Sequence, residues 1–165
     1  MIILKKLLIM TACAASAVLM LTGCGKGNSS EKGDPEITAK TVLSQIDPTL
    51  MDGMACKGDE LFDKNCMKNY GISDEDVIDG GILYNKSGDR PDEISVLKMD
   101  DSDAAHDALK QRLEQRRAIF DGYAPDEMVK FDRAVITDFK GYWILIISEE
   151  AQDLSNQVKA HFDGR

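Results

Sequence analysis

The sequence predicts a single α+β domain over residues 34–165, in which helices pack against a four-stranded, mostly antiparallel sheet. Three observations support this fold class. Apolar residues recur at helical spacing in several segments, and two pairs of short apolar runs are each separated by turn residues. The elements follow the order α-α-β-β-α-α-β-β-α, whereas a parallel sheet would require strands and helices that alternate one by one.

Two helices are predicted before the first strand. The first begins at Asp34–Glu36, where a capping carboxylate precedes a proline in the first turn, and it ends before Asp47–Pro48. Its apolar stripe consists of Ala39, Val42, Leu43 and Ile46. The second helix runs from Asp59 to Tyr70 and stops at Gly71, and Ser73–Asp76 can form one further turn.

A β-hairpin is predicted after Gly80–Gly81, which breaks the helical pattern. Ile82–Asn85 is short and apolar, and Glu93–Met99 is a second strand-like run. Ser87–Pro91, which lies between them, contains Gly, Asp and Pro and is typical of a turn. We therefore expect the two strands to be antiparallel neighbours.

The longest helix is predicted at Asp103–Asp121, with Ser102 as its cap and Gly122 at its end. The residues expected on its buried side are Ala105, Leu109, Leu113 and Phe120. Pro125–Glu127 opens a short helix that carries Met128 and Phe131.

A second hairpin is predicted near the end of the chain. Its strands are Ala134–Phe139 and Tyr142–Ser148, joined by a tight turn at Lys140–Gly141. The strand Tyr142–Ser148 is apolar at consecutive positions, which predicts an internal strand covered on both faces. Ser148–Glu150 begins the last helix, whose apolar positions are Ala151, Leu154, Val158 and Phe162.

Residues 1–23 have the pattern of a secretory signal peptide. Lys5 and Lys6 precede sixteen uncharged, mainly apolar residues, and a helix of this length spans about 24 Å. A retained transmembrane helix is the less favoured alternative, since the hydrocarbon core is ~30 Å thick. The run ends in Leu21–Cys24, which resembles the lipobox of bacterial lipoproteins: an aliphatic residue, two small residues and a cysteine. The resemblance implies cleavage before Cys24 and attachment of a diacylglyceryl group to its sulfur.

Residues 24–33 are expected to be the lipidated cysteine and a flexible tether, because Gly25–Gly33 is rich in glycine and serine. Two acyl chains anchor a protein stably, whereas one does so only marginally. The net charge of −9 argues against non-specific binding of nucleic acid and against attraction to anionic lipids. The membrane is therefore expected to be contacted through the lipid on Cys24.

The remaining cysteines, Cys56 and Cys66, form a possible disulfide in an exported protein, since Cys13 leaves with the signal peptide. Ten residues on one helix separate two Cα atoms by ~15 Å, and a disulfide requires less than about 7 Å. Pairing therefore needs a break between them, and Gly58 supplies one. The alternative is two free, half-buried thiols.

No catalytic residue, metal site or cofactor is predicted. His106 and His161 have no cysteine at metal-ligand spacing, and nothing in the sequence brings a cysteine to either histidine as a nucleophile pair. The acidic run Asp100–Asp103 fits helix capping better than a calcium loop, because Arg112 would occupy the position of the bidentate glutamate.

A small basic patch is formed by Arg112, Arg116 and Arg117 on one helix. Two interpretations are open. The patch can bind a phosphate or a polymer that carries carboxylates, or the arginines can pair with local acids such as Asp121.

Three linked stretches resemble a family of Gram-positive bacterial proteins catalogued as domain of unknown function 4358. The stretches are Glu93–Lys98, Arg112–Gln115 with Phe120 and Tyr123–Glu127, and Gly141–Ser148. The resemblance covers about Gly71 to Phe162. It implies an α+β fold and the character of an envelope lipoprotein, and it supplies no activity and no site residues.

These features favour a lipid-anchored lipoprotein on the extracytoplasmic face of the cell membrane, which acts as a non-enzymatic binding domain. Its expected partner is an envelope protein or polymer, and not a nucleic acid. The alternative is an envelope hydrolase whose carboxylates act as general acid and base. A third hypothesis is an assembly subunit that uses an exposed sheet edge.

Overall fold

The computed structural model describes residues 37–47, 49 and 51–165. The predicted signal peptide, Cys24, the tether and the predicted helix start at Asp34–Glu36 lie outside the described residues. Within the described ranges, no helix has the length and apolar character needed to cross a membrane.

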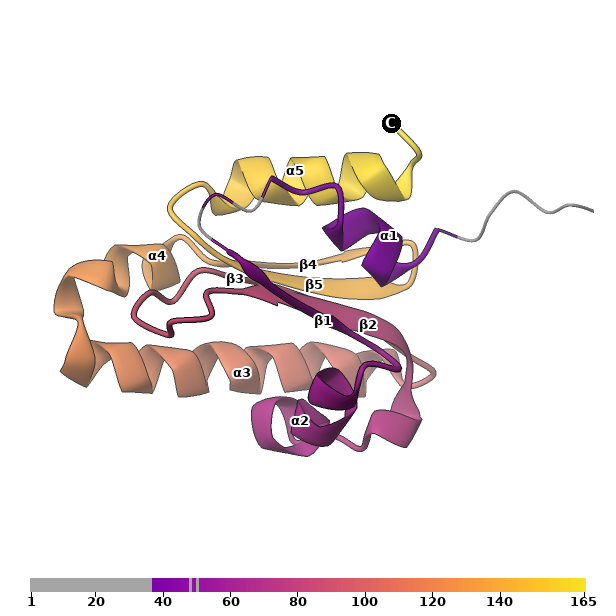
Figure 1. Ribbon diagram of the computed structural model, residues 1–165, viewed down its shortest axis with the longest axis horizontal. Helices are drawn as coiled ribbons and strands as arrows, with labels where there is room; N and C mark the ends of the chain where they lie inside the picture. The colour runs from indigo at the N-terminus through magenta and orange to yellow at the C-terminus, as the bar shows by residue number, and fades with distance from the viewer. Residues whose placement is uncertain (1–36, 48, 50) are drawn as a thin grey trace, which may run out of the picture. The chain divides into compact units, whose positions relative to one another are not determined.

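Five antiparallel strands form one open sheet in the order β1-β2-β3-β5-β4 (Figure 1). The strands are β1 (Gly53–Cys56), β2 (Val77–Tyr84), β3 (Glu93–Met99), β4 (Val135–Phe139) and β5 (Tyr142–Ile147). Both predicted hairpins are present, as the pairs β2–β3 and β4–β5. The α+β class and the antiparallel sheet are therefore confirmed, and the predicted number of four strands is wrong.

The additional strand is β1, which pairs with β2 from Gly53 opposite Tyr84 to Cys56 opposite Gly81. Glycine and alanine have little intrinsic preference for strands, so β1 exists because β2 offers it a partner. β2 also begins earlier than predicted and runs through Gly80 and Gly81. A Cβ atom on Gly80 would lie 2.9 Å from the carbonyl oxygen of Val96. These glycines permit close packing within the strand and do not end it.

Helices cover both faces of the sheet (Figure 1). On one face lie α1 (Ala39–Leu43) and α5 (Ala151–Phe162), and on the other lie α2 (Glu60–Tyr70), α3 (Ser102–Tyr123) and α4 (Met128–Asp132). Two short 3₁₀ helices, Asp74–Asp76 and Pro125–Glu127, complete the set of helices in the described part of the chain.

The strand β5 is buried on both faces, as predicted. Ile144 and Ile146 pack into the core beneath α1 and α5, whereas Leu145 and Ile147 pack into the core beneath α2, α3 and α4. All four side chains are fully buried. Burial of each such side chain contributes about 1.5–3 kcal/mol to the hydrophobic stabilisation.

The ends of α3 differ from the prediction. Asp101, and not Ser102, caps the helix, because its Oδ1 accepts a hydrogen bond from the backbone N–H of Ala104 at 3.0 Å. The Ser102 hydroxyl instead accepts a hydrogen bond from the indole N–H of Trp143 at 2.9 Å. The helix continues through Gly122 to Tyr123, so Gly122 does not terminate it.

Candidate functional site

A buried carboxylate defines the site. Glu93 is the first residue of β3, and strand alternation places it with Ser95 and Leu97 on the sheet face that α2 and α3 cover. Its side chain is fully buried. An unpaired buried charge costs several kcal/mol, so the partners of Glu93 determine what this part of the fold can do.

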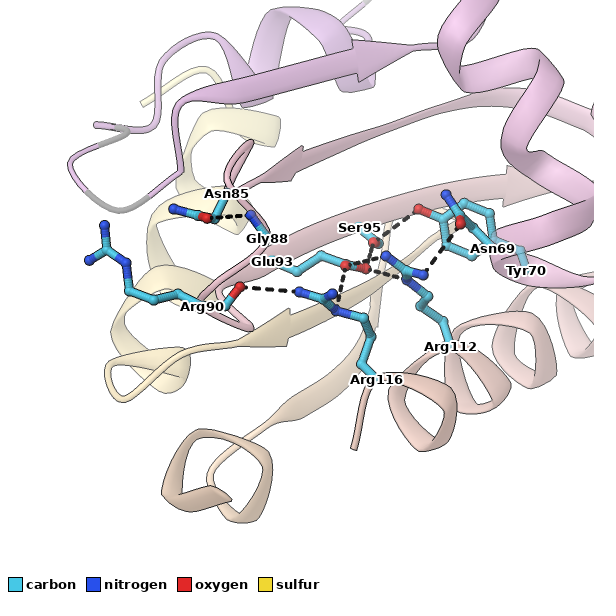
Figure 2. A network of polar contacts seen from close by, with 9 residues as sticks. All are labelled: Asn69, Tyr70, Asn85, Gly88, Arg90, Glu93, Ser95, Arg112 and Arg116. Carbon is cyan, nitrogen blue, oxygen red and sulfur yellow. Dashed lines mark hydrogen bonds and ion pairs between the residues drawn. The ribbon is translucent and has the colours of Figure 1, made fainter. Parts of the chain in front are cut away.

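Arg112 on α3 binds both oxygens of this carboxylate. Its Nε donates to Oε1 at 2.9 Å and its Nη2 donates to Oε2 at 2.7 Å (Figure 2). Ser95 donates a third hydrogen bond to Oε1 at 2.7 Å, and the Tyr70 hydroxyl contacts the Ser95 hydroxyl at 3.1 Å. Burial acts to lower the pKa of Arg112, but the attraction of Glu93 outweighs it and the pKa is raised. Arg112 therefore satisfies the carboxylate, and the two charges cancel.

Arg116, one turn further along α3, is less completely paired. Its Nε lies 3.5 Å from Oε2 of Glu93 without a hydrogen bond, and its Nη2 donates a long hydrogen bond of 3.3 Å to the carbonyl of Arg90 (Figure 2). Burial, assisted by the charge of Arg112, lowers the pKa of Arg116 against the attraction of Glu93. Two guanidinium groups thus share one carboxylate, which leaves the cluster with one surplus positive charge.

A cleft of about 200 Å³ lies beside this cluster, between α2, α3 and the sheet. The side chains of Glu93, Arg112 and Arg116 form its charged wall. The other lining residues are Ala55, Leu61, Phe62, Asn65, Asn69, Tyr70, Ile82, Tyr84 and Asn85. Its walls are therefore mainly apolar with a few polar groups, which is the usual composition of a small-molecule site.

Two asparagine amides in the cleft have donors to spare. The Oδ1 of Asn69 accepts a long hydrogen bond of 3.4 Å from Nη1 of Arg112. The Oδ1 of Asn85 accepts from the backbone N–H of Gly88 at 2.9 Å (Figure 2). It also accepts from the Ser87 hydroxyl at 2.5 Å. Within the described ranges neither amide NH₂ group has a partner, so both can donate to a ligand.

A second buried ion pair adjoins the first in sequence and lies outside the cleft lining. Asp92 is fully buried, and Lys130 on α4 donates to its Oδ2 at 2.7 Å while also pairing with Glu127 at 2.6 Å. Burial acts to lower the pKa of Lys130, but the two carboxylates outweigh it and the pKa is raised. Each of the consecutive acids Asp92 and Glu93 therefore receives its own basic residue from a helix.

This geometry suits recognition better than proton transfer. Among the described residues that line the cleft, Glu93 is the only carboxylate, and three hydrogen bonds already hold its two oxygens. A general acid or base must have a lone pair or proton within reach of the reacting group. The partly paired guanidinium of Arg116, in contrast, can bind an anion.

The structure distributes the predicted basic patch over two places. Arg112 and Arg116 reach the cleft, whereas Arg117 forms an ion pair with Asp132 at 3.0 Å. All three arginines therefore pair with acids, as the second interpretation expected, but in the described part of the chain the partners are Glu93 and Asp132 and not Asp121. Glu93 was missed, although a charged residue at an inward position of an apolar strand was a signal for it.

The cysteines and histidines lie elsewhere. Cys56 at the end of β1 and Cys66 on α2 are free, buried thiols, and burial raises the pKa of each to about 11. His106 packs against Trp143 with ring centres 4.6 Å apart and the ring planes tilted by 49°. The Nδ1 of His161 is buried and has no hydrogen-bond partner among the described residues. Among the described residues, no group of three His, Cys, Asp or Glu side chains could hold a metal ion.

The fold and the cleft define an α+β domain in which an antiparallel sheet, covered by helices on both faces, carries a small site with a charged wall. Residues 53–148 match the family described as a domain of unknown function (DUF4358), and this match spans more than half of the chain. The chain belongs to this family. The match begins with β1 and ends before α5, so it starts and stops earlier than the range of Gly71–Phe162 suggested by resemblance. No curated protein and no solved structure matches the chain.

Proposed function

We propose that this protein is a lipid-anchored binding domain on the extracytoplasmic face of the cell membrane, and that its ligand occupies the cleft between α2, α3 and the sheet. The lipobox-like sequence Leu21–Cys24 and the Gly/Ser-rich tether after it support the anchor. The observation that carries the binding role is the incomplete pairing of Arg116 in the cleft wall.

The charged wall is preorganised for binding. Glu93 holds Arg112 through two hydrogen bonds and keeps Arg116 within 3.5 Å, and the ring of Phe120 lies 4.9 Å from the Arg116 guanidinium. A side chain that is already held loses little conformational freedom when a ligand arrives, which improves affinity. Beside it, Leu61 is 52% exposed and offers apolar surface that a ligand can cover.

NMR tests the binding role through the side-chain amide signals of Asn65, Asn69 and Asn85. A panel of small neutral, anionic and cationic compounds is added to the full chain in detergent while these signals are followed. We expect the compounds that bind to shift these signals. The variant Asn65→Trp, which adds a large ring to the cleft wall, should abolish the shifts of Asn69 and Asn85. Met67→Trp is the matched control, because Met67 is 64% exposed and lies on the face of the same helix opposite Asn65. Binding that maps elsewhere would contradict the proposed site.

The anchor is tested separately by mass spectrometry of the N-terminal peptide from the native protein. We expect a peptide that begins at Cys24 and carries an acylated glyceryl thioether. An unmodified Cys24, or an intact leader that includes Met1–Gly23, would contradict the anchor and leave the binding role of the cleft unaffected.

A further inference from the structure

We infer that the ligand of this cleft presents a single carboxylate next to a small apolar group. This inference rests on the proposed binding role of the cleft and specifies the chemistry of its ligand. Two sources supply that chemistry, a free short-chain carboxylic acid and the C-terminal residue of a peptide.

The charge of the cleft wall favours a monoanion. The wall contains two guanidinium groups and one carboxylate, and Arg112 is already neutralised by its two hydrogen bonds to Glu93. One positive charge remains, on Arg116. The buried carboxylate of Asp92 also attracts it, but Asp92 is itself paired with Lys130, so it offsets this charge only in part. A monoanion balances this surplus, whereas a dianion exceeds it and is also repelled by Glu93 at close range.

The geometry of the donors in the cleft favours a carboxylate. A guanidinium is a planar fork that matches the two oxygens of a carboxylate. The Nε of Arg116 is buried against Glu93, its Nη2 makes one long hydrogen bond, and within the described residues its Nη1 makes none, so the Nη1 end of the fork can donate to a ligand. The NH₂ groups of Asn69 and Asn85 add neutral donors in the same cleft. The same pair of arginines already holds one carboxylate, that of Glu93, which shows that the wall is complementary to this group.

A phosphate is the less suitable anion, although guanidinium groups bind phosphates as well as carboxylates. Phosphate sites usually add several backbone N–H groups or a lysine. No lysine lines this cleft within the described residues, and the backbone N–H of Gly88 is bonded to Asn85. An inorganic or organic phosphate is therefore the disfavoured anion, and it serves as a competitor in the test.

The apolar walls determine the size and apolar character of the part of the ligand that lies outside its carboxylate. Ala55, Leu61, Phe62 and Ile82 border the cleft, and Tyr84 adds a ring beside them. The volume of about 200 Å³ is below the roughly 300–1,000 Å³ of sites for drug-sized molecules. A branched acid of a few carbons, or one terminal residue of a peptide, is of suitable size.

The experiment measures dissociation constants for five probes on the full chain in detergent, by NMR titration of the Asn69 and Asn85 amides. The probes are isovalerate, isovaleramide, inorganic phosphate, N-acetyl-alanyl-leucine with a free carboxylate, and the same dipeptide as its C-terminal amide. We expect the carboxylates to bind at least about tenfold more tightly than their amides, because a hydrogen bond to a charged partner is worth more than one to a neutral partner. Tighter binding of the free dipeptide identifies a peptide C-terminus, and tighter binding of isovalerate identifies a small free acid.

Two variants localise the effect. Arg116→Gln should weaken carboxylate binding by about tenfold and leave amide binding unchanged, since it removes only the surplus charge. Arg117→Gln is the matched control, because its partner Asp132 lies outside the cleft, and carboxylate binding should not change. Arg116→Lys keeps the charge but loses the planar fork and should give an intermediate affinity.

Three results would overturn the inference: amides that bind as tightly as the acids, phosphate that binds as tightly as the carboxylates, or an Arg116→Gln protein with unchanged carboxylate affinity. If neutral probes still shift the amides of Asn69 and Asn85, the cleft remains a binding site and only the carboxylate inference fails. If no probe of any charge shifts them, the proposed binding role fails as well.

Discussion

Arg112 and Glu93 form a bidentate ion pair, with Nε to Oε1 at 2.9 Å and Nη2 to Oε2 at 2.7 Å, that ties the first residue of β3 to the middle of α3. The side chain of Glu93 is fully buried and that of Arg112 is only 13% exposed. Both charges are therefore largely removed from water, and each depends on the other for compensation. The same pair forms one wall of the cleft, so it couples the stability of the fold to the integrity of the site.

Loss of the Glu93 charge should destabilise the protein strongly. Glu93→Gln leaves two guanidinium groups without their carboxylate, and removal of one partner from a buried pair costs about 3–5 kcal/mol. Urea unfolding monitored by circular dichroism measures this loss. Glu114→Gln makes the same chemical change at an exposed position of α3 and should alter the unfolding free energy by no more than about 0.5 kcal/mol. Equal stability of the two variants would show that the buried pair contributes little.

The position of β5 in the core predicts a contrast between two identical substitutions. Leu145→Asp should unfold the domain, because Leu145 is fully buried and an isolated buried carboxylate costs several kcal/mol. Leu61→Asp should leave it folded, because Leu61 is 52% exposed and lies in the first turn of α2, where the helix dipole favours an acid. Circular dichroism and gel filtration distinguish the outcomes. A folded, monomeric Leu145→Asp protein would contradict the burial of β5 on both faces.

Features with a local cause could be predicted from the sequence. The apolar run at Tyr142–Ile147 indicated a strand covered on both faces, and the structure confirms it. Gly71 was predicted to end α2, and it does so with a positive φ of 71°. Lys140 and Gly141 have φ values of 51° and 79°, as expected for the tight turn that joins β4 to β5.

Features that depend on distant partners could not be predicted in the same way. β1 is defined by its pairing with β2, and the glycines Gly80 and Gly81 indicate a strand only once the crowding around them is known. In the site, Arg112 and Arg116 were recognised because they lie close together on one predicted helix. Their partner Glu93 was not, since 19 residues separate it from Arg112 and the packing of α3 on the sheet brings them together.

The proposed anchor predicts the behaviour of one cysteine substitution. Cys24→Ala removes the sulfur that would carry the lipid, so we expect the protein to leave the membrane fraction or to accumulate as an uncleaved precursor, with its fold unchanged. Cell fractionation followed by immunoblotting measures the distribution. Cys13→Ala is the matched control, since Cys13 lies in the predicted signal peptide and should not affect attachment. Membrane retention of processed Cys24→Ala protein would contradict the proposed anchor.

The possible disulfide between Cys56 and Cys66 is testable independently of function. Both are free thiols in the structure, and alkylation with iodoacetamide in denaturant, with and without prior reduction, determines their state in the native protein. Labelling of both residues only after reduction would establish the disulfide. Labelling without reduction would establish two buried free thiols.

In the reduced protein the two thiols should make stability fall at alkaline pH. Burial, with smaller contributions from nearby acids, raises the pKa of Cys56 and Cys66 from 9.0 to about 11. Between about pH 9 and 11 the unfolded chain releases protons that the folded protein keeps, so the unfolded state binds fewer protons and the free energy of unfolding decreases as pH rises. A difference of this size corresponds to about 3 kcal/mol for each thiol when its titration is complete. Urea unfolding across this range should therefore show that the free energy of unfolding declines less with pH in the double variant Cys56→Ala/Cys66→Ala than in the parent protein. The packing energy that the substitutions remove does not affect this comparison of slopes, because the other titrating groups are common to both proteins. Parallel pH profiles for the two proteins would contradict the raised pKa values.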